Sequence, residues 1–184
     1  MKGILRVFML GIAVLVYAFT SCSLQDDGPV FSSRDLEHPD MVMYDADYLL
    51  GMAKRQPIFI HAEIIELYQD GLALLESIEF IQKAQDGSIS ITGSADFGEI
   101  NTDTNDAKLT GRVIVSNIAD DIRVEAEELN WNHAERLLSC PLDKAATVNY
   151  SDRYTITGYG FTGDFTSATF EFARVEQGVV LDVE

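Results

Sequence analysis

Glycine residues form the first pattern in this sequence that could carry chemistry. The segment Gly158-Tyr159-Gly160-Phe161-Thr162-Gly163 matches the dinucleotide-binding fingerprint letter for letter. That fingerprint holds a pyrophosphate at the N-terminus of a helix within a βαβ unit. The residues after Gly163 instead show strand periodicity from Thr166 to Val175. We therefore interpret these glycines as a bend in a strand.

A second pattern resembles the start of a calcium-binding loop. Asn101, Asp103 and Asn105 have the spacing of its first ligands. Position six is Asp106 where glycine is needed, and position twelve is Arg112 where glutamate is needed. The segment is therefore predicted to be a polar hairpin turn, and we expect neither a metal site nor a cofactor.

The remaining reactive side chains are isolated from one another. His38, His61 and His133 lie far apart, with no pair at metal-ligand spacing, and Cys140 has no CxxC partner and no neighbouring base. We expect a structural thiol and no enzymatic activity. Trp131, between two asparagines, is a sugar-binding platform or a core aromatic at the end of a strand, and the second interpretation is favoured.

The charge balance limits the partners. The 184 residues include 13 Lys and Arg against 30 Asp and Glu, a net charge of −17. Nucleic-acid binding depends on clustered cations that neutralise phosphates, so no nucleic-acid partner is expected. Hydrophobic residues make up 47% of the chain, enough for one folded domain with an appended segment.

The N-terminus has the features of an export signal. Lys2 and Arg6 precede the uncharged run Val7–Phe19, whose 13 residues are too few to span a bilayer core as a helix. Small residues then precede Cys22, as in a bacterial lipobox. We predict a signal peptide over residues 1–21, lipid attachment at Cys22 and a tether over residues 22–40. An uncleaved signal anchor and a plain secretory peptide are the alternatives, and all three place the domain outside the cytoplasm.

From residue 41 onward the hydrophobic pattern has a period of two, which is typical of half-buried strands. One stretch, from Leu72 to Ile81, fits either a helix or a strand. Clear alternation occurs at Ile89–Thr92, Ile122–Glu125, Tyr154–Thr157 and Phe170–Phe172, and turns are predicted at Asp70-Gly71, Asp86-Gly87, Thr102–Asp106, Asp120-Asp121, Ser151-Asp152 and Gly163-Asp164.

A weak internal repeat supports an antiparallel sheet. Four triplets read aliphatic, any, small, and their small residues are 31, 33 and 32 positions apart. A module of that length fits two or three strands with their turns. We predict an all-β domain over residues 41–184, a twisted open antiparallel β-jellyroll or β-roll that follows the N-terminal signal or anchor segment. The triplets are Ile60-His61-Ala62, Ile91-Thr92-Gly93, Val124-Glu125-Ala126 and Ile156-Thr157-Gly158.

Taken together, the segments resemble the LptC family of lipopolysaccharide export proteins and the related LptA-type periplasmic domains. The resemblance runs from about Val42 to Val180 and rests on order and spacing rather than on one specific motif. Its residues are Phe59–Glu63, Leu72–Leu74, Phe80, Asp86-Gly87, Ile91–Asp96, Ala107–Val115, Ile122–Trp131, Arg136–Cys140, Ile156–Phe161 and Val175–Gly178.

The resemblance implies a β-roll on the periplasmic side of the inner membrane. Such a protein receives lipopolysaccharide, or a similar glycolipid, from an inner-membrane ABC transporter and passes it to an LptA-like periplasmic β-roll protein. Two features depart from the family. The family usually keeps a transmembrane anchor where this chain has a lipobox-like Cys22, and the strong acidity would repel lipid A phosphates. The glycolipid therefore carries less charge, or its head group stays outside the groove.

Three sets of site residues follow from these arguments. The family-motif glycines are Gly93, Gly111, Gly158 and Gly160. The partner-docking edge is Thr169, Phe170, Glu171, Phe172 and Ala173, unless this strand pairs inside the roll. The lipid-binding groove, whose residues would equally suit any β core, is Ile91, Val113, Val115, Val124, Leu129, Ile156, Phe161, Phe170 and Phe172. The alternative function is a secreted structural or adhesive lipoprotein that binds protein or sugar at its surface.

Overall fold

The computed structural model describes residues 38–51, 56–151, 153–164 and 169–180. These residues belong to one compact unit, which spans Glu37–Glu184. Within the described ranges the regular structure consists of strands, with no helix, and the strand pairs are antiparallel. The predicted all-β antiparallel roll is therefore confirmed.

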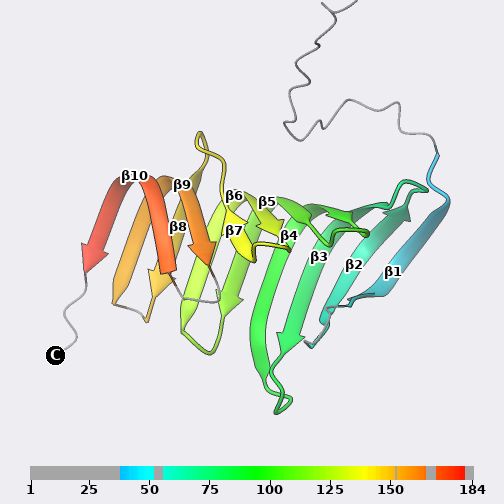
Figure 1. Ribbon diagram of the computed structural model, residues 1–184, viewed down its shortest axis with the longest axis horizontal. Helices are drawn as coiled ribbons and strands as arrows, with labels where there is room; N and C mark the ends of the chain where they lie inside the picture. Colours follow the sequence, from blue (N-terminus) through cyan, green and yellow to red (C-terminus); the bar gives the residue numbers. More distant parts are fainter. Residues whose placement is uncertain (1–37, 52–55, 152, 165–168, 181–184) are drawn as a thin grey trace, which may run out of the picture. The chain divides into compact units, whose positions relative to one another are not determined.

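Ten strands form one sheet (Figure 1), in the order β1-β2-β3-β4-β5-β6-β7-β9-β10. The strand β8 pairs with β6 and β9, off this path. The strands are β1 (Met41–Leu50), β2 (Ile58–Leu67), β3 (Leu72–Lys83), β4 (Ile89–Asn101), β5 (Ala107–Asn117), β6 (Ile122–Asn132), β7 (Leu137–Ser139), β8 (Ala145–Tyr150), β9 (Tyr154–Asp164) and β10 (Thr169–Val180).

Two short strands share one place in the sheet. The strand β7 pairs with the end of β6 at residues 130–132, whereas β8 pairs with its beginning at residues 122–126. Both then pair with β9 on their other side. The connection over residues 140–144 therefore interrupts what would otherwise be one long strand between β6 and β9.

The long strands change direction near their middle. Asp45, Ser77, Gly111 and Gly160 have positive φ angles, between 49° and 95°, although each lies inside a strand. Such left-handed residues and the accompanying β-bulges bend a strand and increase its twist. The pairing of β4 with β5 shifts register between Ser94 and Phe97 of β4. The pairing of β5 with β6 shifts register between Thr110 and Val113 of β5, on either side of the bend residue Gly111.

The bend shifts the alternation of buried and exposed residues by one position along each strand. Buried residues are two apart along each half of a strand but three apart across the bend. The extra residue keeps the apolar side chains of both halves on the same face of the sheet. The pairs that bracket the bend are Ala62 and Ile65, Leu75 and Ile78, Ala95 and Gly98, and Gly158 and Phe161.

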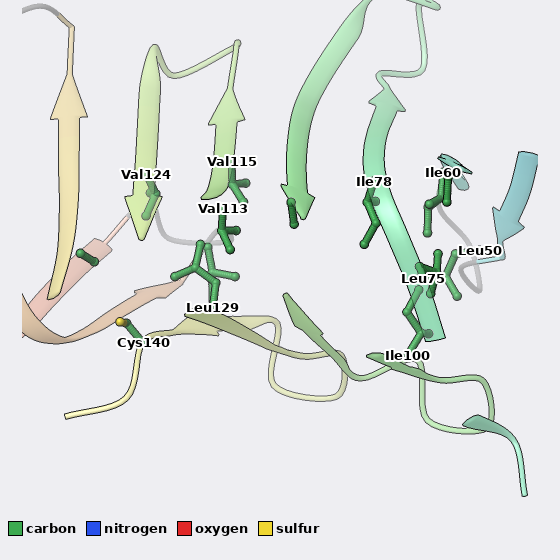
Figure 2. Packing of buried hydrophobic residues seen from close by; sticks show 14 of the residues in the cluster. Leu50, Ile60, Leu75, Ile78, Ile100, Val113, Val115, Val124, Leu129 and Cys140 are labelled. Atoms are coloured by element: carbon green, nitrogen blue, oxygen red, sulfur yellow. The ribbon is translucent and has the colours of Figure 1, made fainter. Parts of the chain in front are cut away.

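The sheet therefore folds over a single apolar core. Figure 2 shows labelled core side chains from both halves pointing toward one another between two layers. We call this the inner face. Of the described residues, no polar or charged one is buried. The buried members of the inner face are Leu50, Ile60, Ala62, Ile65, Ala73, Leu75, Ile78, Ala95, Ile100, Val113, Val115, Ile122, Val124, Leu129, Leu138, Cys140, Ala146, Val148 and Phe161.

Most sequence-based expectations about the elements agree with this arrangement. The ambiguous stretch from Leu72 to Ile81 is a strand, and the repeated triplets lie on β2, β4, β6 and β9. The repeat therefore corresponds to two antiparallel strands with their turns. The predicted turn at Gly163-Asp164 is wrong, because β9 continues through Asp164 to pair with Leu137 of β7 and Thr169 of β10.

Candidate functional site

All nine residues predicted to line a lipid-binding groove lie on the inner face. Five are buried, and Ile91, Phe170 and Phe172 are half-buried and pack against the core. Ile156 is also half-buried and lies opposite buried Val148 in the ladder of β8 with β9. The buried five are Val113, Val115, Val124, Leu129 and Phe161. The fold brings these residues together, and lipid contact at them stays a prediction.

Three phenylalanines from β9 and β10 form one end of the inner face. The Phe161 ring lies 6.0 Å from that of Phe170 and 5.4 Å from that of Phe172, centroid to centroid. Phe161 is fully buried, whereas the two rings from β10 remain half-buried. This end of the core is therefore both aromatic and partly accessible.

The residues predicted from the sequence did not include the part of the inner face that β1 to β3 contribute. These candidates began at Ile91, whereas buried side chains begin at β1. One sequence feature could have pointed to some of these residues: apolar residues three positions apart at the bend. A search for strict alternation takes such a step for the end of a strand. The buried aliphatic residues that were missed in β1 to β4 include Leu50, Ile60, Ile65, Leu75, Ile78 and Ile100.

The four family-motif glycines lie where a side chain would collide or be strained. Gly111 and Gly160 have φ angles of 95° and 61° at the bend. A Cβ on Gly158 would lie 2.5 Å from the backbone oxygen of Arg174, and one on Gly93 would overlap the Phe80 ring. These glycines therefore set close packing and the bend, and they present no group that could bind a ligand.

The outer side of the bend carries paired charges. Lys144 Nζ lies 3.1 Å from Glu127 Oε2, which joins the 140–144 connection to β6. His61 Nδ1 lies 3.0 Å from Asp47 Oδ1, and His61 Nε2 lies 3.4 Å from Asp45 Oδ1. The hydrogen bond to Asp47, together with nearby carboxylates, raises the pKa of His61. These pairs fasten neighbouring strands at the bend.

An open hollow of about 520 Å³ lies on the outer side of β2 to β5. Its lining mixes charges of both signs, including His61, Asp96 and Arg112. Asp96 and Arg112 bond to each other and His61 bonds to Asp47, so these three side chains are already paired within the protein. The hollow offers no converging catalytic groups.

The other reactive side chains have structural roles. Cys140 is buried, its backbone N–H donates to Phe161 O at 2.8 Å, and burial raises the pKa of its thiol to about 11. In the turn between β4 and β5, Asn101 Oδ1 accepts hydrogen bonds from the backbone N–H groups of Asp103 and Thr104. This confirms the polar hairpin turn. No group of His, Cys, Asp and Glu side chains in the described ranges could hold a metal ion.

The two ends of the strand order are β1 and β10. Within the part of the chain that the structure describes, β10 has β9 as its one partner strand, and β1 has β2. The predicted docking residues, Thr169 to Ala173, lie in the first half of β10, where Phe170 and Phe172 face inward and Thr169, Glu171 and Ala173 are exposed. The family-implied docking at this edge stays a prediction.

The signal peptide over residues 1–21, the lipidated Cys22 and the tether up to residue 37 lie outside the described residues. None of the residues that the structure describes forms a helix long and apolar enough to cross a membrane.

Comparisons with known proteins agree with this fold. The sequence profile of the family described as lipopolysaccharide-assembly, LptC-related, matches residues 9–178. No curated protein matches the chain. A similar solved structure is the crystal structure of LptH, the LptA homologous periplasmic component of the conserved lipopolysaccharide transport device from Pseudomonas aeruginosa. It has 16% sequence identity and a TM-score of 0.53, and the match covers 65% of this chain and 83% of that one, so it shows a shared fold.

The family profile spans most of the 184 residues, and it includes every strand up to the last residues of β10. This chain therefore belongs to the LptC-related family of lipopolysaccharide-assembly proteins.

Proposed function

We propose that this protein is a periplasmic lipid carrier. It receives lipopolysaccharide or a similar glycolipid from an inner-membrane ABC transporter and passes it to an LptA-like periplasmic β-roll protein. Membership of the LptC-related family supports a role in lipopolysaccharide assembly. The observation that carries the relay itself is the continuous apolar inner face, which runs from β1 to β10.

An apolar inner face meets the main energetic need of such a carrier. Each buried methylene is worth about 0.8 kcal/mol, so exposing a fatty-acyl chain of ~14 carbons to water costs on the order of 10 kcal/mol. Because no charged or polar residue of the described part is buried, the floor of the inner face presents only apolar side chains to an acyl chain.

Half-buried residues give the lipid its access. The fully buried side chains, such as Val124 and Leu129, form the floor of the site because they have no surface left to offer. Ile91, Phe170 and Phe172 retain exposed surface beside that floor. We place the acyl chains along these half-buried side chains, between the two layers of the sheet.

The acidity of the chain places the head group outside. With a net charge of −17 and none of the described carboxylates buried, negative charge is concentrated on the outer surface. A phosphorylated head group would be repelled there, and it would find no cation between the layers. The head group is therefore expected to project away from the inner face, or to carry little charge.

The terminal strands provide the transfer route. A strand at the edge of a sheet can pair with a strand of another protein. Docking of Thr169 to Ala173 in β10 onto an LptA-like sheet would align the two inner faces, so the lipid could move without entering water. The transporter supplies the energy, and β1, at the opposite end of the strand order, faces the transporter side in this arrangement.

A lipid on Cys22 would hold the domain at the periplasmic side of the inner membrane. Two or more acyl chains give stable anchoring, whereas one chain is marginal. Labelling cells with a fatty-acid probe tests this anchor. Incorporation should be lost in Cys22→Ala, and equal labelling of the two proteins would show that the lipobox interpretation is wrong.

Identifying the lipid that is bound to the extracted protein tests the proposed relay. The full chain is extracted from membranes and analysed by native mass spectrometry, in parallel with Phe172→Glu and Phe59→Glu. Phe172 is half-buried on the inner face, whereas Phe59 is 44% exposed on the outer face of β2. Bound glycolipid is expected with the unaltered protein and with Phe59→Glu, and it should be lost with Phe172→Glu.

Circular dichroism of each variant shows that the sheet is retained. The absence of acyl-chain adducts from all three proteins would contradict the proposal. That result would favour the alternative, a surface-binding β-domain with a closed core.

A further inference from the structure

Two side-chain nitrogens near one end of the inner face are shielded from solvent and lack a hydrogen bond. They are Trp131 Nε1 and His133 Nδ1, and neither has a partner among the described residues. Buried polar atoms in folded proteins are nearly always paired, so two unpaired ones within three residues of each other call for an explanation.

Trp131 lies where the inner face reaches the end of β6. It is the second-last residue of β6, two positions after the fully buried Leu129, and it is half-buried and packs against the core. His133 follows in the turn between β6 and β7, and its backbone N–H donates to Asp106 Oδ1 at 2.8 Å. The two nitrogens thus lie at the border between the apolar interior and the turns.

The strand neighbours of Trp131 explain why no described side chain accepts its N–H. Ala107 of β5 and Leu138 of β7 lie opposite Trp131 in the two ladders. Leu138 in turn lies opposite Gly163 of β9, and Gly163 lies opposite Phe170 of β10, so these residues form one row across the strands. Every residue in this row is apolar or glycine, so the row contains no side-chain hydrogen-bond acceptor for the indole N–H.

The surroundings define the chemistry of a ligand group that would fit. The indole nitrogen is a donor only, so it needs an acceptor. That acceptor must be attached to a chain that the apolar row accommodates. The carbonyl oxygen of a fatty-acyl ester or amide meets both conditions, because it joins a long hydrocarbon to a polar head.

We propose that Trp131 donates a hydrogen bond to the acyl-linkage carbonyl of a bound lipid, while the acyl chain extends along the half-buried rings of Phe170 and Phe172 in β10. His133 Nδ1, which can donate or accept according to its tautomer, pairs with a polar atom on the head-group side of that carbonyl. This inference rests on the proposed function and adds to it a class of linkage and the site that recognises it.

The test uses two lipids that differ by one carbonyl group. The full chain is reconstituted in nanodiscs of ether-linked phosphatidylcholine, which contain no acyl carbonyl. It is then titrated with 1-hexadecanoyl-lysophosphatidylcholine or with its 1-O-hexadecyl ether analogue. Because Trp131 is the single tryptophan of the chain, its indole N–H gives one assignable NMR signal.

The ester is expected to move the indole N–H signal downfield and to bind about three- to tenfold more tightly than the ether, as one hydrogen bond to a sheltered carbonyl warrants. Trp131→Phe, which keeps an aromatic ring but has no N–H, should bind ester and ether equally. His133→Leu should weaken ester binding but keep a preference for it.

The outcomes separate this inference from the proposed function. Equal binding of ester and ether by the unaltered protein, with no change in the indole signal, would overturn the role of Trp131 and leave the carrier function standing. Binding of neither lipid would overturn the acyl-linkage site, whereas the carrier function is contradicted only by the absence of glycolipid in native mass spectrometry of the extracted protein. The comparison with the unaltered protein does not depend on whether Trp131→Phe folds. Unchanged ester binding by His133→Leu would remove His133 from the site.

Discussion

Asp96 and Arg112 bind each other across the bend, where β4 and β5 shift register. Arg112 Nη2 and Nε donate to Asp96 Oδ1 at 2.9 and 3.1 Å, and the Arg112 backbone N–H donates to Asp96 Oδ2 at 3.1 Å. A Cβ on Gly111 would lie 2.5 Å from Asp96 Cβ. The Asp96 carboxylate therefore accepts hydrogen bonds from the Arg112 guanidinium and also from the Arg112 backbone N–H, which the bulge takes out of the strand pairing.

The first prediction concerns acid stability. The hydrogen bonds from Arg112 hold the pKa of Asp96 below its usual range. A depressed carboxyl pKa stabilises the folded state above the ordinary value of about 4, and this contribution is lost as the pH falls through the folded value. Asp96→Asn should therefore lower Tm at neutral pH, by a difference that shrinks below about pH 4.

Thermal unfolding followed by circular dichroism measures this difference. Asp143→Asn, which removes an exposed carboxylate from the 140–144 connection, is the control. A Tm difference between Asp96→Asn and the unaltered protein that stays constant from neutral pH to pH 3 would contradict the assigned role. The pair is exposed, so added salt should also reduce the difference.

The second prediction tests the bend itself. Gly160 has a φ of 61°, and a Cβ there would lie 2.6 Å from Leu142 Cδ2 and 2.9 Å from Ala173 Cβ. Gly160→Ala should lower the free energy of unfolding by about 2 kcal/mol, because a left-handed conformation disfavours any side chain.

Gly178→Ala is the matched control, since nothing lies within 4 Å of its Cβ position in β10. We expect it to change the free energy of unfolding by less than about 0.5 kcal/mol. Urea denaturation measures both values, and equal effects of the two substitutions would show that Gly160 is not a constrained bend position.

The third prediction concerns the buried thiol. Burial raises the pKa of Cys140 to about 11, so at pH 8 its thiolate fraction is on the order of a hundredfold lower than that of a free cysteine. In a Cys22→Ala background, iodoacetamide should label Cys140 rapidly in concentrated urea and very slowly in buffer.

The thiol of the unfolded chain ionises at a lower pH than the buried thiol of the folded protein. The free energy of unfolding should therefore also fall as the pH rises above about 8.5. Similar labelling rates in urea and in buffer would contradict this burial.

The sequence allowed the strand-based architecture to be predicted better than its interior. Period-two alternation indicated the strands around Ile91, Val124 and Ile156, because one face of each is apolar. The bend reverses the phase of that alternation, and a reversal of phase has the same appearance in sequence as a turn. The candidates came from β4 onward, so the buried residues of β1 to β3, such as Ile60 and Ile65, were missed, and so was Ile100 beyond the bend of β4.

Pairing partners explain the remaining differences. Gly163 and Asp164 are residue types that favour turns, yet β7 and β10 hydrogen-bond to both sides of this segment and keep it extended. The lack of a side-chain acceptor beside Trp131 depends on residues of β5, β7, β9 and β10. No local pattern in the sequence contains that information, whereas the nine inner-face candidates followed from alternation together with the family resemblance.

The fourth prediction concerns the docking edge. Crosslinkers placed singly at Thr169, Glu171 and Ala173 in cells should capture a β-rich periplasmic partner, because these exposed side chains lie on the terminal strand β10. Arg123, on β6 in the middle of the sheet, is the control and should capture none. Failure at all three positions, with the protein folded, would show that β10 does not dock a partner.

Site-specific photo-crosslinking in cells tests most directly whether acyl chains lie on the inner face. A photoreactive phenylalanine analogue replaces Phe172, which is half-buried among the inner aromatic rings, or Phe59, which is exposed on the outer face. In both variants a phenylalanine is replaced, and the two positions differ in the face of the sheet on which they lie. We expect glycolipid adducts from Phe172 and none from Phe59. Adducts from Phe59 alone, or equal yields from both positions, would contradict a lipid path along the inner face.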